Sequence, residues 1–324
     1  MTRLDYVAKR FGFALVTVFL AVTLNFILFR AVPGDAVSAL RCRQCTPQFK
    51  AYERKHLGLD RSRWHQYGLY LTDLAHGSLG HSLRTERSVA AELWQPIKNT
   101  VPMVALGTFF SIALGVLIGV ISAWRRGTAV DRAGLWSALS FYSMPPQWLG
   151  LLIVLFVAGA LGLPTSGIKD PTLGILSTPS TWAVVVDHLR HMILPALTLG
   201  LVLYGEYALI VRSSMLETLG EDYILTARAK GLSSWTTVWK HGLRNALLPV
   251  VTLVALSLGF VIGGSITIEY VFSYPGIGLQ VVEAIDQRDY PVLQGAFLLL
   301  TLSVIFFNLA ADLIYFKLDP RVSE

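Results

Sequence analysis

The segment DYILTARAKGLSSWTTVWKHGLRNALLPVVT, residues 222–252, separates two long apolar runs, Leu194–Val211 and Leu247–Ile268. Each run is long enough to cross the roughly 30 Å of hydrocarbon in a bilayer. The basic and helix-prone segment between them must therefore lie at one face of a membrane. Its small residues, glycine and cations, gathered in one loop, predict a surface that docks a partner.

The composition of the whole chain supports a membrane protein. Of the 324 residues, 53% are hydrophobic and only 15% are charged, and the mean hydropathy is +0.55, well above that of an average soluble domain. Six segments approach the roughly 20 apolar residues that a spanning helix needs. These are Phe11–Phe29, Val101–Ala123, Leu135–Leu161, Met192–Val211, Leu247–Ile268 and Val292–Tyr315. We predict an all-α integral membrane protein with six transmembrane helices, because lipid satisfies no backbone hydrogen bond.

Lysine and arginine in the short connections predict the orientation. Three segments on one side carry the cations Arg3, Lys9, Arg10, Arg125, Arg126, Arg132, Arg228, Lys230, Lys240 and Arg244. The short loops on the other side hold only Lys169, Arg190 and Arg288. The positive-inside rule therefore places both termini in the cytoplasm, and the long segment 30–100 outside, since long loops translocate largely regardless of charge. The first span is interpreted as a retained anchor, because Arg30 and Pro33 follow it where a signal peptide would be cleaved.

The outer segment 30–100 reads as a structured unit. Trp64, Tyr67 and Tyr70 are spaced by three and would form one face of a helix. Such a unit would offer a surface or lid to a partner, or would only shield the ends of the helices. Its two cysteines, Cys42 and Cys45, form either a local disulfide or an unbonded pair, since no second ligand pair at zinc spacing accompanies them.

Motifs for nucleotide hydrolysis and common hydrolytic chemistry are missing. The sequence has no Gly-Lys dipeptide, hence no phosphate-binding loop, and neither HExxH nor GxSxG. The closest histidines, His188 and His191, fit an anchor at the membrane interface better than a metal site. Any ATP chemistry must therefore come from a partner. Membrane lipid is an expected partner and nucleic acid is not.

Two features inside the apolar spans suggest moving or lining parts. MPPQW, residues 144–148, should kink or interrupt the third span, because proline lacks an amide donor and crowds the preceding turn. Glu206 lies within the fourth span, where a carboxylate is costly. It either faces a water-filled path or makes a structural hydrogen bond.

Two parts of the opening segment resemble a known loop. TARAKGL at 226–232 and HGLRNALLPVVT at 241–252 are similar to the EAA-type loop of ABC importer permeases, in its oligopeptide and dipeptide variant. Ala227, Gly231 and Leu243 match the general form, whereas in this register the leading Glu and the Pro are absent.

The resemblance extends over nearly the whole chain. Its further motifs are PGD at 33–35, LGLD at 57–60, GHSLRT at 80–85, HMILPALTLG at 191–200, RSSMLE at 212–217, EYVFSYPGIG at 269–278 and RDYP at 288–291. The chain thus resembles the permease subunits of oligopeptide or dipeptide ABC importers, the inner-membrane component of binding-protein-dependent transport.

This resemblance implies a type I ABC importer permease fold with a structured extracytoplasmic loop between the first two transmembrane helices. Its expected regions are 1–32 with the first span, 33–100 outside, a permease core 101–315 with a coupling loop at about 212–246, and a tail 316–324. The implied partners are a second homologous permease, one or two ABC ATPase subunits and an extracytoplasmic peptide-binding protein. The chain itself would be no enzyme and bind no cofactor, since ATP and Mg would bind the ATPase subunits. The alternatives are import of nickel or another small solute, and a secondary transporter.

The resemblance assigns ATPase docking to the coupling loop, as a helix that enters a groove. Gly231 would end the helix in a left-handed conformation, Leu232 would anchor it, and Arg228 with Lys230 would steer it to an acidic rim. The docking candidates are Asp222, Tyr223, Thr226, Ala227, Arg228, Ala229, Lys230, Gly231, Leu232, His241 and Arg244. From composition alone, an amphipathic loop lying on anionic lipid is the alternative.

Transport of a peptide implies a wide, weakly binding path. The candidates for lining it are Ser140, Tyr142, Ser143, Gln147, Glu206, Ser257 and Ser265. The outer segment with its aromatic residues and Ser-Tyr-Pro-Gly turn would be an external gate or, equally, a rigid scaffold. The gate candidates are Glu269, Tyr270, Phe272, Tyr274, Pro275 and Gly276.

Overall fold

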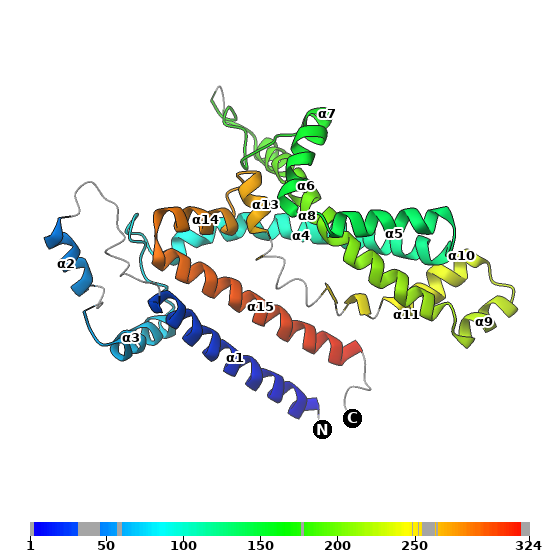
Figure 1. Ribbon diagram of the computed structural model, residues 1–324, viewed down its shortest axis with the longest axis horizontal. Helices are drawn as coiled ribbons and strands as arrows, with labels where there is room; N and C mark the ends of the chain where they lie inside the picture. Colours follow the sequence, from blue (N-terminus) through cyan, green and yellow to red (C-terminus); the bar gives the residue numbers. More distant parts are fainter. Residues whose placement is uncertain are drawn as a thin grey trace. The chain divides into compact units, whose positions relative to one another are not determined.

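The computed structural model describes residues 3–31, 46–56, 60–175, 178–247, 249–251, 253–254, 263 and 265–318. The regular structure in these residues is helical, apart from one isolated antiparallel bridge between His81 and Ser88 (Figure 1). The predicted disulfide candidates Cys42 and Cys45, and the path candidate Ser257, lie outside the described residues.

Four described helices are long and apolar enough to cross a membrane. They are α1 (Arg3–Ala31), α4 (Val89–Trp124), α8 (Thr181–Thr218) and α15 (Tyr290–Leu318). They confirm the first, second, fourth and sixth predicted spans. The fifth, Leu247–Ile268, lies largely outside the described residues.

The third predicted span, Leu135–Leu161, is not one straight helix. Helix α5 (Ala129–Tyr142) ends at the two prolines, and α6 (Pro146–Ile153) continues through the π-helix η1 (Val154–Ala158) into α7 (Gly159–Leu161). The two parts are bent by 106°. The predicted interruption at MPPQW is therefore confirmed, because a proline pushes the residue before it out of the helical region.

Helices α4 and α8 extend well beyond the predicted spans. Helix α4 begins at Val89, where the Ser88 hydroxyl accepts the Ala91 N–H, and α8 begins after Ser180, whose hydroxyl accepts the Ala183 N–H. At its other end α8 continues to Thr218, so the motif RSSMLE is helical rather than part of the loop. Apolar length marks the stretch in hydrocarbon, whereas the helix ends are set by such caps.

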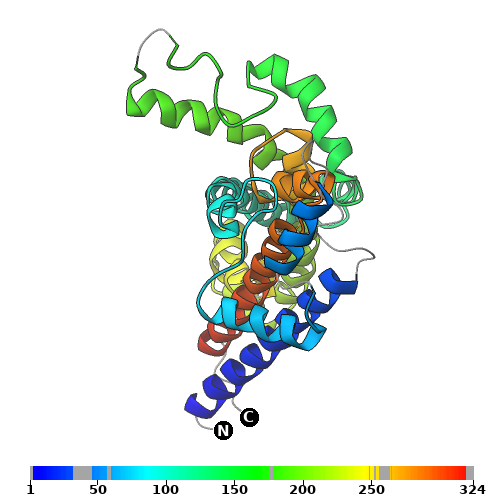
Figure 2. The ribbon, with the colours of Figure 1, turned by 90° about the vertical axis from the view of Figure 1, so that its left-hand side faces the viewer.

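The chain divides into two compact units, Met1–Thr100 with Pro275–Glu324, and Val101–Tyr274, with the boundary inside α4. In the first unit α1 lies along α15, and the start of α1 and the end of α15 lie at the same end of the pair (Figures 1 and 2). An ion pair joins Arg10 to Asp312 at 2.9 Å there. Helices α2 (Pro47–His56) and α14 (Ile277–Gln287) belong to the same unit.

The predicted aromatic face of the outer segment packs on the first span. It lies on α3 (Arg63–Ala75), where the Tyr67 hydroxyl is 2.7 Å from that of Thr23, and the Tyr70 hydroxyl donates to Asn25 at 3.3 Å. The third member of the face, Trp64, is 84% exposed. Tyr67 and Tyr70 thus shield the end of α1, while Trp64 remains on the surface.

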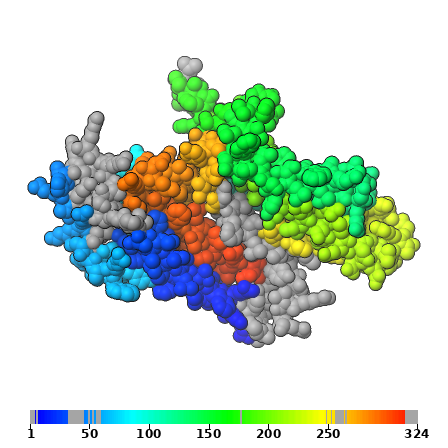
Figure 3. Space-filling view, viewed as in Figure 1, coloured from blue at the N-terminus to red at the C-terminus, as the bar shows by residue number. Residues whose placement is uncertain are grey.

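In the second unit α8 is the central helix. Gly115 of α4 packs so closely that a Cβ atom there would lie 2.5 Å from Tyr207 Cβ. A Cβ at Gly205 would lie 2.3 Å from the carbonyl oxygen of Ala138 in α5. Figure 3 shows α5 lying directly against α8. These glycines bring α4 and α5 into backbone contact with α8.

A candidate docking loop after helix α8

The first half of the loop is helix α9 (Asp222–Ala229), and its end is defined by a glycine. Gly231 has φ +80°, its N–H donates to Arg228 O at 2.9 Å, and the Leu232 N–H donates to Ala227 O at 3.3 Å. These two bonds form a Schellman motif. Because a Cβ at Gly231 would meet nothing within 4 Å, its backbone conformation rather than space favours glycine. The predicted left-handed helix end is confirmed.

The second half of the loop turns back and packs against the end of α8. After Ser233, whose hydroxyl accepts the Thr236 N–H, come α10 (Ser234–Thr236), the π-helix η2 (Thr237–Gly242) and α11 (Leu243–Ala246). A Cβ at Gly242 would lie 3.3 Å from Met215 of α8 and 3.4 Å from Leu219, the C-cap residue of α8. Met215 is fully buried in an apolar cluster formed by side chains of α4, α8 and the loop. The loop is therefore packed onto the end of α8.

One hydrogen bond ties the two halves together. The Asn245 amide donates to the Tyr223 hydroxyl at 2.7 Å. Both residues line a polar groove of about 340 Å³ together with Ser214, Glu217, Thr218, Glu221 and Pro249.

The predicted docking residues divide between the inside and the outside of the loop. Ala227 is only 7% exposed and offers little surface to a partner, contrary to the prediction. His241 is half-buried. The remaining candidates are exposed, namely Asp222, Tyr223, Thr226, Arg228, Ala229, Lys230, Gly231, Leu232 and Arg244.

Large apolar side chains lie on the outer surface of the loop, and they were not among the predicted docking residues. Trp235 and Leu225 are 59% and 55% exposed. The Trp235 ring meets that of Trp124 of α4 edge-on and is tilted against that of Trp239, with ring centroids 5.9 and 5.1 Å apart. Aromatic side chains and arginine are enriched at protein interfaces. The available signal was the short spacing of Leu232, Trp235 and Trp239 in the sequence.

The path candidates are partly brought together. Ser140, Tyr142, Ser143 and Gln147 are all exposed and flank the break between α5 and α6. Glu206 is half-buried on α8, next to the Gly205 that contacts α5. Ser265 is fully buried and donates to Glu269 at 3.0 Å, so it lines no open surface in this structure.

The gate candidates are mostly packed. Glu269 and Phe272 of α13 (Ile266–Val271) and its C-cap, and the following Tyr274, are at most 2% exposed, whereas Tyr270 is 58% exposed. Burial, with the charge of Glu269 adding to it, raises the pKa of Tyr274 to about 12. Pro275 and Gly276 belong to the other unit, where the Asn99 amide donates to Pro275 O at 2.7 Å. This packing favours the rigid scaffold over the external gate.

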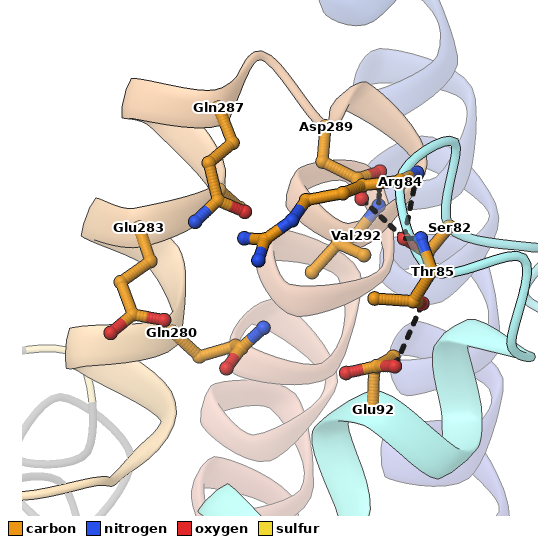
Figure 4. Close-up of a pocket in the computed structure, with 10 residues that line it drawn as sticks. Ser82, Arg84, Thr85, Glu92, Gln280, Glu283, Gln287, Asp289 and Val292 are labelled. Atoms are coloured by element: carbon orange, nitrogen blue, oxygen red, sulfur yellow. Dashed lines mark hydrogen bonds between the residues drawn. The ribbon is translucent and has the colours of Figure 1, made fainter. Parts of the chain in front are cut away.

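Two motifs distant in sequence meet in the first unit. Ser82 of GHSLRT donates to Asp289 of RDYP at 2.5 Å, and the Leu83 N–H reaches the same carboxylate at 3.3 Å. They border a polar pocket of about 190 Å³, into which the Arg84 guanidinium points toward Gln280 and Gln287 of α14 (Figure 4). Its other lining residues are Thr85, Glu92, Glu283, Ala284 and Val292. No sequence signal joined two segments about two hundred residues apart.

Within the part of the chain that the structure describes, no group of three or more His, Cys, Asp or Glu is placed to hold a metal ion. His191 is buried, and its Nδ1 is 2.8 Å from Asp187 O.

Comparison with known families covers both units. Residues 115–324 match the family described as binding-protein-dependent transport system inner membrane component, and residues 3–102 match its N-terminal region. The chain belongs to this family.

Curated relatives match it over nearly their whole length. The dipeptide transport system permease protein DppB of Alkalihalophilus pseudofirmus is 38% identical over 95% of this chain and 96% of its own. The di/tripeptide transport system permease protein DppB of Pseudomonas aeruginosa is 38% identical over 98% of both chains. The glutathione transport system permease protein GsiC of Escherichia coli is 35% identical over 98% of this chain and 99% of its own.

A solved structure shares the fold. A chain of the inward-facing MetNI methionine ABC transporter superposes with a TM-score of 0.54 at 21% identity, covering 70% of this chain and 96% of its own. The predicted type I importer permease fold is confirmed, and the chain is a permease subunit rather than an enzyme.

Proposed function

We propose that this chain is the transmembrane permease subunit of an ATP-binding cassette importer that carries short peptides across the cytoplasmic membrane. The observation that carries the proposal is the near-full-length similarity to permeases named for dipeptides, for di- and tripeptides, and for glutathione, itself a tripeptide. These substrates share a short peptide backbone. A wide path that binds this backbone weakly serves all of them.

The docking loop, defined as residues 222–246, receives an ABC ATPase subunit. Leu225, Leu232 and Trp235 supply exposed apolar anchors, and Arg228 with Lys230 supplies positive charge next to them. Such a surface fits a groove with an apolar floor and an acidic rim. ATP and Mg bind the ATPase subunits.

Both termini lie in the cytoplasm, on the same side as the docking loop. The start of α1 and the end of α15 lie at one end of the helix pair, and the short connections rich in Lys and Arg are predicted for this side (Figure 2). A second, homologous permease completes the path, and an extracytoplasmic peptide-binding protein delivers the substrate to the opposite face.

Substitution of Gly231 by Val tests the docking loop. A β-branched residue is strained at φ +80°, so the Schellman end of α9 should be lost and Leu232 displaced. We expect the ATPase subunits to stop co-purifying with the permease, and uptake of a radiolabelled dipeptide to fall to background.

Gly77 provides the matched control. It has φ +77°, nothing lies within 4 Å of its Cβ position, and it is far from the docking loop in sequence, just after α3. Gly77→Val should leave the ATPase subunits bound. Full dipeptide uptake by the Gly231→Val protein, inserted at normal levels, would refute the proposal.

A further inference from the structure

The last turns of α8 contact two other parts of the second unit. On one side Met215 and Leu219 pack against Gly242 in the docking loop. One turn earlier, Arg212 faces the first turn of α5. The docking loop and α5 are thus attached to the same short stretch of helix.

The attachment to α5 is a two-pronged ion pair. Arg212 Nε donates to Asp131 Oδ1 at 2.7 Å, and its Nη2 donates to Asp131 Oδ2 at 2.9 Å. Asp131 Oδ2 also accepts the Gly127 N–H at 2.9 Å, from the turn that joins α4 to α5. One carboxylate therefore connects the α4–α5 turn, α5 and α8.

The burial of this pair makes it a geometric link. The Asp131 side chain is 4% exposed and that of Arg212 is 21% exposed, so water has little access to the carboxylate. A buried ion pair is weak evidence for stability, because desolvation offsets most of the attraction. A planar guanidinium held at two points does, however, fix direction as well as distance.

The neighbouring helices are already in close contact. A Cβ at Gly134 of α5 would lie 2.2 Å from Ser122 Oγ of α4. With the contact of Gly205 to Ala138, α4, α5 and α8 pack as one piece, and the ion pair extends that piece toward the docking loop. Apart from this ion pair, no described residue from Arg212 to Thr218 hydrogen-bonds to α5.

We propose that Arg212 is a positioning residue for transport, which acts through Asp131. It holds the end of α8 in a fixed relation to α4 and α5, so that displacement of the docking loop moves these helices instead of bending α8. The inference rests on the proposed function, in which an ATPase subunit supplies that displacement. Neither residue is proposed to touch ATP or peptide.

The test removes the link without leaving a charge unpaired. A single neutral substitution would bury one uncompensated charge and could unfold the protein. The double variant Arg212→Met, Asp131→Asn avoids this, since methionine keeps the apolar stem and asparagine still accepts the Gly127 N–H. Arg212→Lys is the milder variant, which keeps the charge but loses the two-pronged geometry.

The complete transporter, with its partner permease, ATPase subunits and binding protein, is reconstituted into liposomes. The readout is radiolabelled dipeptide taken up per ATP hydrolysed. We expect the ATPase subunits to remain bound and to hydrolyse ATP. Uptake per ATP should fall about tenfold in the double variant, and by less in Arg212→Lys.

The control is the exposed ion pair of the first unit. Arg10→Gln with Asp312→Asn removes a pair of the same type that is 41% and 36% exposed, and should leave uptake per ATP unchanged. A merely structural role of Arg212 would lower the amount of folded transporter but not this ratio. Unchanged uptake per ATP in Arg212→Lys and the double variant overturns the inference. Loss of the ATPase subunits from the unsubstituted transporter would instead contradict the proposed docking.

Discussion

Replacing Gly115 by Ala should destabilise the second unit through the contact of α4 with α8. The added Cβ would lie 2.5 Å from Tyr207 Cβ and 3.0 Å from Tyr204 O, and Tyr207 is fully buried. Carbon atoms pack best at about 3.5 to 4 Å, so the two helices must separate by about 1 Å. Overpacking of this kind costs about 1 to 3 kcal/mol. Alanine recovers up to about 1 kcal/mol as the better helix former.

The net expectation is a loss of about 1 to 2 kcal/mol in the free energy of unfolding, measured by denaturant titration in detergent. Gly12 of α1 provides the control, since a Cβ there meets nothing within 4 Å. Gly12→Ala should be neutral or slightly stabilising. The reasoning is refuted if Gly115→Ala is as stable as Gly12→Ala.

Two further predictions concern buried polar groups. Ser82→Ala removes a hydrogen bond to the buried Asp289 carboxylate and should cost about 1 to 3 kcal/mol, seen as faster proteolysis of segment 80–88. Thr85→Ala, which removes an exposed bond to Glu92, is its milder control. Because the pKa of Tyr274 is raised to about 12, its neutral form is favoured in the folded state. Its contribution to stability should be complete below pH 10 and disappear as the pH rises toward 12, at a cost of at most about 3 kcal/mol. Comparison of Tyr274→Phe with the natural chain in alkaline unfolding measures this, and equal pH dependence would contradict it.

Local signals predicted the features that a few neighbouring residues determine. The consecutive prolines 145 and 146 interrupt the helix after α5, because two successive residues lack the amide that the helix needs. Gly231 similarly ends α9, since few other residues adopt φ +80° without strain. The length of the apolar runs located α1, α4, α8 and α15, because this length also depends only on consecutive residues.

Features that depend on tertiary neighbours could not be predicted. Ala227 was predicted to be a small residue open to a partner, yet on α9 it is only 7% exposed. Helices α14 and α15 join the compact unit of the N-terminal hundred residues, an association without a local signal. Arg212 lay in a recognised motif, RSSMLE, but its role depends on Asp131, eighty-one positions away.

The two kinds of feature combine in the docking loop. Its tip is stiffened locally, by the Schellman motif around Gly231, and its base is held by tertiary packing of Met215 on Gly242. A loop that is stiff at the tip but free at its base would absorb the motion of a docked subunit as bending. Because α8 continues from this base to Arg212, and Asp131 holds Arg212 to α4 and α5, we expect the motion to reach these helices of the second unit. Under the proposed coupling, peptide movement driven by ATP should require both the glycine, which the sequence reveals, and the ion pair, which only the fold reveals.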